Sequence, residues 1–306
     1  MAATPALGLG LPVSGAWATP ENMRHVAVRA EELGYASLWS FQRLLHPVDE
    51  DWGAVYHGVI DPVSALAYVA ACTSGIRLGT AVVNLPFYSP IVLSKALTTV
   101  DIVSKGRLDV GLGLGWAAAE FEAVGVPMEK RGARAAEFIE CLTAIWTQPE
   151  VEYHGQFYDV PLSRVEPKPV QQPHPPLLMG GTADAALRRI GRIADGWISS
   201  SRTDLTTIGQ SIDVVRSAAS EAGRNTGALR FVTRGVVRLG GEAPADRVPL
   251  QGSADQIRSD LQALAAAGVT EVFLDLNWDP ETVAQDVSAA AALDNAERVM
   301  TELAPG

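Results

Sequence analysis

The residues best suited to proton transfer lie in one polar stretch, about 42–60. It contains His46 and His57, and imidazole is the side chain that most readily exchanges a proton near neutral pH. The acidic run 49–51 lies in the same stretch, and a solvated surface loop accounts for those acids more simply than a catalytic cluster. The sequence has no HExxH, G-x-S-x-G or Walker pattern, so zinc-dependent and nucleophilic hydrolysis lack a motif.

The glycine-rich run LDVGLGLGWAAAEF, residues 108–121, is a second candidate site. A dinucleotide-binding turn needs the pattern G-x-G-x-x-G, but three positions after Gly113 the chain has Trp116. We therefore reject that interpretation. Gly111 and Gly113 then either relieve crowding in the protein interior or let a flat ring approach the backbone, and their spacing favours neither role.

A third candidate begins where the apolar run PLLMGG ends and a helical pattern starts. Gly180, Gly181 and Thr182 would leave free amide groups at a helix N-terminus, which attracts anions such as a cofactor phosphate. An ordinary strand-to-helix turn also favours glycine, so this motif alone is weak.

Short apolar runs alternate along the chain with longer amphipathic segments. The expected strands are 7–13, 36–41, 76–85, 107–115, 176–181, 195–200, 229–239 and 271–278, each followed by helix, and the last helix is expected over 280–303. Eight strand–helix units favour an α/β fold of the (β/α)8 TIM-barrel type over a doubly wound sheet. We expect a single domain, 1–306, with an inserted hairpin and proline-rich segment at about 148–175, before strand five.

Composition narrows the class of protein. The net charge of −11 disfavours nucleic acid as a partner, and 47% hydrophobic against 19% charged residues indicates a folded core. No secretory signal or membrane span is evident, so we expect a cytoplasmic protein that acts on a small molecule. Cys72 and Cys141 are expected as buried, reduced thiols, and no metal-binding pattern occurs.

Several segments in a fixed order resemble the luciferase-like monooxygenase family, and most closely its actinobacterial F420-dependent oxidoreductases. They are SLWSFQRLL, IRLGTAVVNLPFYSPIVLSKALTTVDIVSKGRLDVGLGLGW, EFEAVGVPMEKRGARAAEF, PKPVQQPHPPLLMGGT and ADGWI. The resemblance covers about residues 7–280. It implies a TIM barrel that binds its cofactor at the mouth formed by the carboxyl ends of the strands.

The resemblance also implies site residues. A bulge with a non-prolyl cis peptide that backs the deazaflavin ring falls at Ala81-Val82, within a motif that ends at Asn84. The cofactor phosphate would contact the glycine turn at 180–182, and Ser200 matches a further cofactor contact. The substrate pocket would be formed by Trp39, Gln42, Arg43 and Trp116.

Two departures from the family pattern concern the proton donor. Many relatives have Asp-His where this chain has Gln42-Arg43, and sugar-phosphate dehydrogenases have glutamate where it has Trp116. Glu120 therefore joins His46 and His57 as a candidate acid–base residue, and sugar-phosphate oxidation is not expected. The resemblance implies coenzyme F420 and hydride transfer to or from a small organic substrate, in a possible homodimer. The alternatives are an FMN-dependent monooxygenase and a non-catalytic F420-binding protein.

Overall fold

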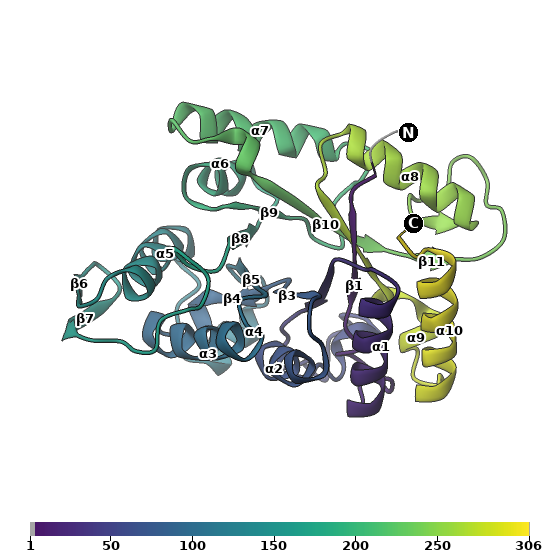
Figure 1. Cartoon of the computed structure of the whole chain (residues 1–306), viewed down its shortest axis with the longest axis horizontal. Helices are drawn as coiled ribbons and strands as arrows, with labels where there is room; N and C mark the ends of the chain where they lie inside the picture. The colour runs from purple at the N-terminus through teal and green to yellow at the C-terminus, as the bar shows by residue number, and fades with distance from the viewer. Residues whose placement is uncertain (1–3, 306) are drawn as a thin grey trace.

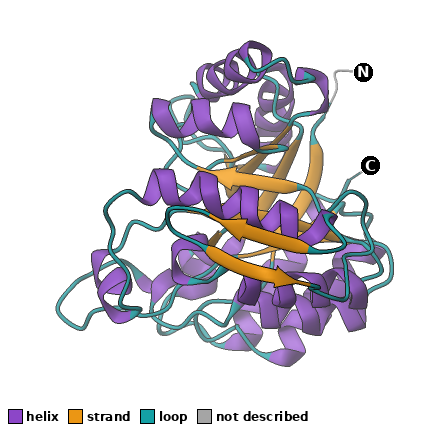
Figure 2. Cartoon of the chain, turned by 90° about the vertical axis from the view of Figure 1, so that its left-hand side faces the viewer, coloured by secondary structure: helices purple, strands orange, loops and turns teal. Residues whose placement is uncertain are grey.

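Eight parallel strands close into a ring in the computed structural model, which describes residues 4–305 (Figures 1 and 2). Each strand pairs with the next, and the last pairs with the first. In ring order they are β1 (Ala6–Gly10), β2 (Ser37–Ser40), β3 (Arg77–Thr80), β5 (Leu108–Gly113), β8 (Leu177–Gly180), β9 (Gly196–Ile198), β10 (Arg230–Val236) and β13 (Glu271–Asp275). The closed ring confirms the TIM barrel and excludes the doubly wound sheet.

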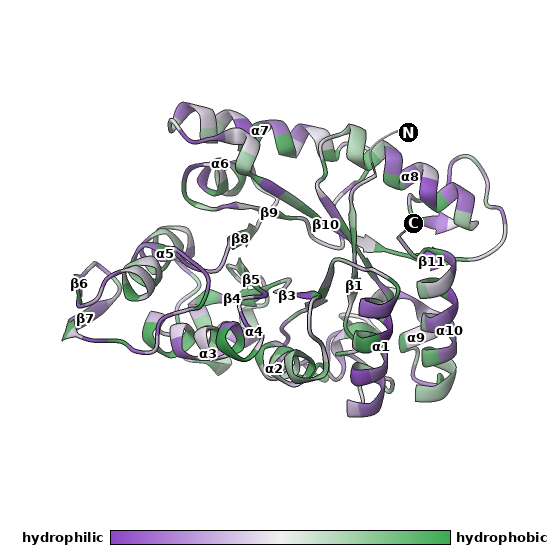
Figure 3. Cartoon of the chain, in the orientation of Figure 1, coloured by the Kyte–Doolittle hydropathy of each residue, from purple (hydrophilic) through white to green (hydrophobic). Residues whose placement is uncertain are grey.

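Helices surround the ring. They are α1 (Pro20–Glu32), α2 (Pro62–Cys72), α3 (Pro90–Val103), α4 (Ala118–Ala123), α5 (Arg131–Thr147), α6 (Asp184–Ile193), α7 (Ile208–Glu221), α8 (Ala254–Ala266), α9 (Pro280–Val283) and α10 (Ala289–Glu302), with 3-10 turns Ala54–Tyr56, Leu85–Phe87, Thr226–Ala228 and Leu276–Trp278. Thr19 caps α1 by accepting a hydrogen bond from the Asn22 amide, and proline occupies the first turn of α1, α2 and α3. Hydrophobic and hydrophilic residues alternate along α8 and α10, as amphipathic packing requires (Figure 3).

Three predicted elements divide differently in the structure. Predicted strand 76–85 is interrupted at residues 81–82, so that β4 (Val83–Asn84) follows β3 separately. Predicted strand 229–239 becomes β10 and β11 (Arg238–Leu239), and β11 pairs with β12 (Gln251–Gly252). The prediction of one closing helix is wrong, because Ser288 caps a new helix, α10, after α9 has ended.

The predicted hairpin is confirmed as the antiparallel pair β6 (Val151–His154) and β7 (Asp159–Ser163). It lies beyond α5, far from both chain termini, at the left of Figure 1. Of the two free cysteines, Cys141 is buried as expected, whereas Cys72 is only half-buried at the end of α2. Among residues 4–305, no helix combines the length and hydropathy needed to cross a bilayer.

Two aromatic rings fill the barrel interior. Trp39 stacks on Phe273 with ring centroids 5.4 Å apart, and its indole nitrogen donates to Glu271. The position opposite is Gly79, where a Cβ atom would lie 2.3 Å from the Trp39 ring. The bulky side chain from β2 therefore requires glycine on β3, and together they close the barrel below its mouth.

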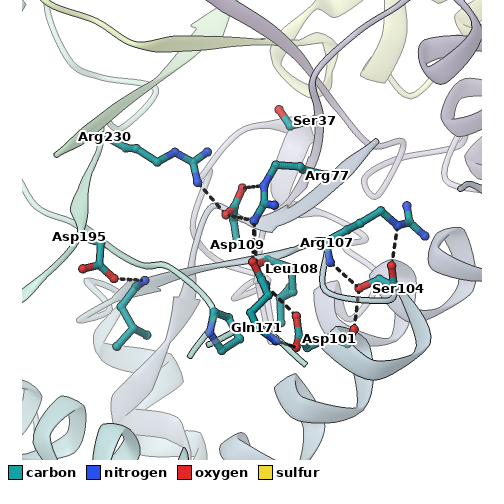
Figure 4. A network of polar contacts seen from close by, with 12 residues as sticks. Ser37, Arg77, Asp101, Ser104, Arg107, Leu108, Asp109, Gln171, Asp195 and Arg230 are labelled. Atoms are coloured by element: carbon teal, nitrogen blue, oxygen red, sulfur yellow. Dashed lines mark hydrogen bonds and ion pairs between the residues drawn. The ribbon is translucent and has the colours of Figure 1, made fainter. Parts of the chain in front are cut away.

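Polar side chains form a network at the other end of the barrel from its mouth, where the strands begin (Figure 4). Asp109 on β5 is fully buried and accepts hydrogen bonds from Arg77 on β3 and Arg230 on β10. Arg230 also pairs with Glu271 on β13 at 2.9 Å. The two acids raise the pKa of Arg230 despite its burial, which would lower it, so the guanidinium keeps its charge.

Candidate functional site

A cavity of about 440 Å³ opens at the carboxyl ends of the strands. It lies at the end of the barrel where catalytic sites form in TIM-barrel enzymes, and its volume suits a small-molecule ligand. Eleven of the residues named from the sequence line it, namely Gln42, Arg43, Ala81, Val82, Asn84, Gly113, Trp116, Gly180, Gly181, Thr182 and Ser200. Segments far apart in the chain are thus brought to one cavity.

The bulge between β3 and β4 forms part of this cavity. The peptide bond between Ala81 and Val82 is cis, as the resemblance implies. Gln42 fixes the segment from the end of β2, because its side-chain oxygen accepts from the Asn84 amide at 2.9 Å. Its amide nitrogen donates to the Tyr88 hydroxyl at 2.6 Å. Gln42 is thus a structural support of the bulge as well as a lining residue.

Arg234 supports the same bulge from β10 and was not identified from the sequence. Its guanidinium donates to the carbonyl oxygen of Ala81 and pairs with Asp275 on β13. Burial lowers its pKa, and the Asp275 carboxylate opposes this effect. The available sequence signal was a second arginine in the middle of the strand LRFVTRGVV, which marks a charge inside the barrel.

The two glycines of the β5 run have different neighbours. A Cβ atom at Gly111 would lie 1.9 Å from the Thr80 carbonyl oxygen, so this position relieves crowding within the barrel. At Gly113, which lines the cavity, a Cβ atom would lie 2.4 Å from the Val82 side chain. Both positions therefore admit the close approach of the β3–β4 segment to β5.

The turn 180–182 lies between β8 and α6, at another part of the cavity wall. Ala183 is the N-cap of α6, and it offers no side-chain acceptor to the first-turn amide groups. These amides and the helix dipole make the turn suitable for an anion. Gly180 has room for a Cβ atom, with its nearest neighbour 3.5 Å away, so it is not required by packing.

Arg43 and Glu120 form a buried ion pair at 3.0 Å, with side chains 5% and 0% exposed. The Glu120 carboxylate also accepts from the Leu44 amide at 2.7 Å. Burial raises the pKa of Glu120, whereas the hydrogen bond from the Leu44 amide and the charge of Arg43 act to lower it. Burial lowers the pKa of Arg43, whereas the charge of Glu120 acts to raise it. Glu120 does not line the cavity, so it acts on the site by holding Arg43.

Three aromatic rings surround the Arg43 guanidinium. Its central carbon lies 4.7 Å from the ring centroid of Trp116, 4.8 Å from Tyr56 and 5.2 Å from Trp52. Such faces stabilise a planar cation and keep it oriented. Trp116 is half-exposed at the cavity, where the sequence resemblance places a pocket wall.

The remaining predicted residues lie outside the cavity lining. Trp39 is 1% exposed within the barrel core, so its assignment as a pocket wall is corrected. His46 and His57 lie next to each other in the β2–α2 connection, with ring centroids 4.4 Å apart. His46 accepts from the Trp52 amide, and His57 contacts Gln285 at 3.1 Å. Neither imidazole lines the cavity, so the histidines are placed as supports of the loop.

The cavity wall is strongly cationic. Its lining residues, which all belong to the described part of the chain, include Arg43, Arg131, Arg202 and Arg234 but no Asp or Glu. Arg43 and Arg234 have buried acidic partners, whereas Arg131 and Arg202 have no ion-pair partner within residues 4–305. In a chain of net charge −11, this concentration of positive charge indicates an anionic ligand.

Comparisons with known proteins agree with this architecture. The family model described as luciferase-like monooxygenase matches residues 3–251. An uncharacterized protein of Mycobacterium tuberculosis, Rv0953c, is 38% identical over 56% of this chain, and the match spans 60% of that relative's length. The FMNH(2)-dependent dimethylsulfone monooxygenase of Pseudomonas putida is 34% identical over 50% of this chain and 42% of its own.

A solved structure shares the fold over nearly the whole chain. The coenzyme F420-dependent tetrahydromethanopterin reductase of Methanopyrus kandleri superposes with a TM-score of 0.75, covering 96% of this chain and 98% of that chain at 18% identity. The closed barrel, the cavity at its mouth and the family match lead to the same conclusion. The chain belongs to the luciferase-like monooxygenase family.

Proposed function

We propose that the protein is an F420-dependent oxidoreductase that moves a hydride between the deazaflavin and a small organic substrate. The observation that carries the choice of F420 is a pair of arginines at the start of α5, one of which lines the same cavity as the turn 180–182. Arg131 lines the cavity at the start of α5, and the neighbouring Gly132 would place a Cβ atom 2.6 Å from the Arg189 guanidinium. Neither arginine has an acidic partner among the described residues.

These charges suit the part of F420 that FMN lacks. Both cofactors combine a tricyclic ring, a ribityl chain and a phosphate, but F420 continues into an acidic oligoglutamate tail. A phosphate at the first turn of α6 would direct that tail toward Arg131 and Arg189. Burial lowers the pKa of Arg189, and nearby Arg192 lowers it further, so an anion at this place would relieve repulsion.

The remaining lining residues fit a flat ring. The ring would lie against the segment Ala81–Val82, which Gln42 and Arg234 hold from two sides. A deazaflavin bound there supplies the hydride chemistry, and the protein supplies orientation and electrostatics. Arg43 would orient a polar substrate group from the aromatic side of the cavity.

An FMN-dependent monooxygenase is the second candidate, because a relative at 34% identity is named as FMNH(2)-dependent. The phosphate turn would serve FMN as well as F420. Arg131 and Arg189 are the feature that distinguishes the candidates, since FMN has no charged group beyond its phosphate.

Fluorescence titration of the purified protein with F420 and with FMN tests the proposal. We expect F420 to bind more tightly, and the pair Arg131→Gln and Arg189→Gln to weaken F420 about tenfold for each lost charged contact. FMN affinity should stay nearly unchanged in both variants. Arg188→Gln is the matched control, because Arg188 pairs with Asp184 on the exposed face of α6. Tighter binding of FMN than of F420 would refute the proposal.

Turnover separates an enzyme from a cofactor-binding protein. With reduced and oxidised F420, a panel of alcohols, ketones and unsaturated carbonyl compounds should include at least one substrate whose conversion changes the F420 absorbance. Tight F420 binding without conversion of any compound would instead support storage or delivery of the cofactor.

A further inference from the structure

A second hollow of about 380 Å³ adjoins the main cavity. The two share Tyr56, Ser201, Arg202 and Trp278. The second hollow extends between the 3-10 turn at 54–56 and helix α9, and none of its lining residues belongs to the bulge or to the turn 180–182. It is therefore separate from the places proposed for the cofactor ring and phosphate.

Flat aromatic groups form much of this second hollow. Trp52, Tyr56 and Trp278 line it together with the aliphatic side chains of Val55 and Val283. Aromatic side chains favour planar, apolar partners, and the volume suits a molecule of one or two fused rings. Among residues 4–305, no Asp or Glu lines the hollow, although α9 contains Glu281.

Two positive charges converge where the hollow meets the main cavity. Arg43 and Arg202 both lie over the Trp116 ring, at 4.7 Å and 5.5 Å from its centroid. Arg202 is close enough to lower the pKa of Arg43, in addition to the larger effect of burial. Within residues 4–305, Glu120 is the only acid that pairs with either guanidinium.

The Arg43 guanidinium also has unused hydrogen-bonding capacity. Glu120 accepts from Nη1, but the buried Nε–H has no acceptor among the described residues. A buried donor without an acceptor is unfavourable, and here it belongs to a side chain that is 5% exposed and lines the cavity. The unpaired Nε–H of Arg43 and the unpaired charge of Arg202 thus belong to two side chains that contact the same ring, that of Trp116.

We propose that this junction binds the carboxylate of a planar aromatic acid between Arg43 and Arg202, with the aromatic ring in the second hollow. The inference rests on the proposed function because it takes this acid as the substrate of the oxidoreductase. The carboxylate would supply the acceptor and the negative charge, and Trp52, Tyr56 and Trp278 would contact the ring. Among alcohols and carbonyl compounds, the favoured substrates are then those that carry an aromatic carboxylate.

Isothermal titration calorimetry of the cofactor-free protein with 2-naphthoate tests the site directly. We expect binding in the millimolar range or tighter, and weaker binding of neutral 2-naphthylmethanol. Arg202→Gln should weaken 2-naphthoate about tenfold and leave 2-naphthylmethanol unchanged, because only the carboxylate loses a charged contact. Arg192→Gln, an exposed arginine on α6, is the matched control.

A second variant tests the hollow itself. Ala284→Trp fills the hollow from the α9 side and should weaken binding of both naphthyl compounds, while F420 affinity stays unchanged because Ala284 lines only the second hollow.

Arg43→Lys keeps a charge for Glu120 and should also weaken binding of 2-naphthoate, since an ammonium cannot reproduce the planar guanidinium.

Three results would overturn the inference. The first is the absence of 2-naphthoate binding, and the second is that Arg202→Gln binds 2-naphthoate as tightly as the unchanged protein does. The third is that Arg202→Gln loses affinity for F420 by the same factor as for 2-naphthoate. The last result would assign the charges to the cofactor. If neither F420 nor FMN binds but 2-naphthoate behaves as expected, the proposed function fails and the aromatic-acid site stands.

Discussion

Some residues of the site lie close together in the sequence, whereas others come from distant parts of the chain. The motif around Ala81–Val82 and the turn 180–182 are local. The family resemblance implied both as candidate cofactor contacts, and the glycine pattern also indicated the turn. Arg234 is 153 positions from the carbonyl group it holds, so no local pattern could connect them. Trp39 was misplaced because a tryptophan at a strand end suits a pocket wall and a barrel core equally well.

Substitution of Gly111 tests the close packing of β3 against β5. Gly111→Ala should destabilise the protein by about 2–3 kcal/mol or more, because the new methyl group would collide with the Thr80 carbonyl oxygen and force β3 away from β5. Urea unfolding measures the change. Gly180→Ala is the control and should change stability by less than about 1 kcal/mol, because its nearest neighbour is 3.5 Å away. Similar losses in both variants would contradict this account.

At the scale of elements, most helix starts could be predicted because their signals are local. Thr19, Asp61 and Ser89 each precede a proline, and each caps its helix, so the signal lies within two consecutive residues. The break between α9 and α10 was missed, because the apolar pattern continues across it and the cap at Ser288 is one serine among several. Loop contacts such as that of Glu31 with the turn 74–76 depend on the tertiary fold.

Glu31 on α1 provides a prediction on pH. Burial would raise its pKa, but the amides of Gly75, Ile76 and Ser74, which precede β3, outweigh burial and lower it. Because the folded-state pKa lies below the ordinary value of 4.5, the stabilisation is complete above that pH and is lost as pH falls through the folded-state pKa. Glu31→Gln should cost about 1–3 kcal/mol at pH 7.

The difference between the two proteins in unfolding free energy, followed by urea titration from pH 7 to pH 3, checks this expectation. It should shrink as the pH falls below 4.5. A constant difference over the whole range would show that ionisation of Glu31 contributes nothing to the turn.

At the scale of the whole molecule, the strand count predicted the barrel because eight apolar runs alternate with helices. The sequence did not predict the ion pairs that join the strands at the end of the barrel opposite the cavity. Arg77, Asp109 and Arg230 come from three different strands, and no spacing rule relates them (Figure 4). The ion pairs of Asp109 thus lie at one end of the barrel and the cavity at the other.

Asp109→Asn tests the contribution of this charge network to the fold. The change leaves two guanidinium groups without their shared buried carboxylate, and we expect a loss of about 3–5 kcal/mol in the free energy of unfolding. Asp184→Asn, which breaks an exposed pair with Arg188, should cost less than about 1 kcal/mol. Equal and small losses in the two variants would contradict a stabilising role for Asp109.

The most direct measurement of the central claim is a crystal structure of the protein with F420. We expect the deazaflavin ring against Ala81–Val82, the phosphate at the turn 180–182, and the acidic tail leaving past Arg131. Electron density for the ring at another place, or a tail directed away from Arg131 and Arg189, would contradict it.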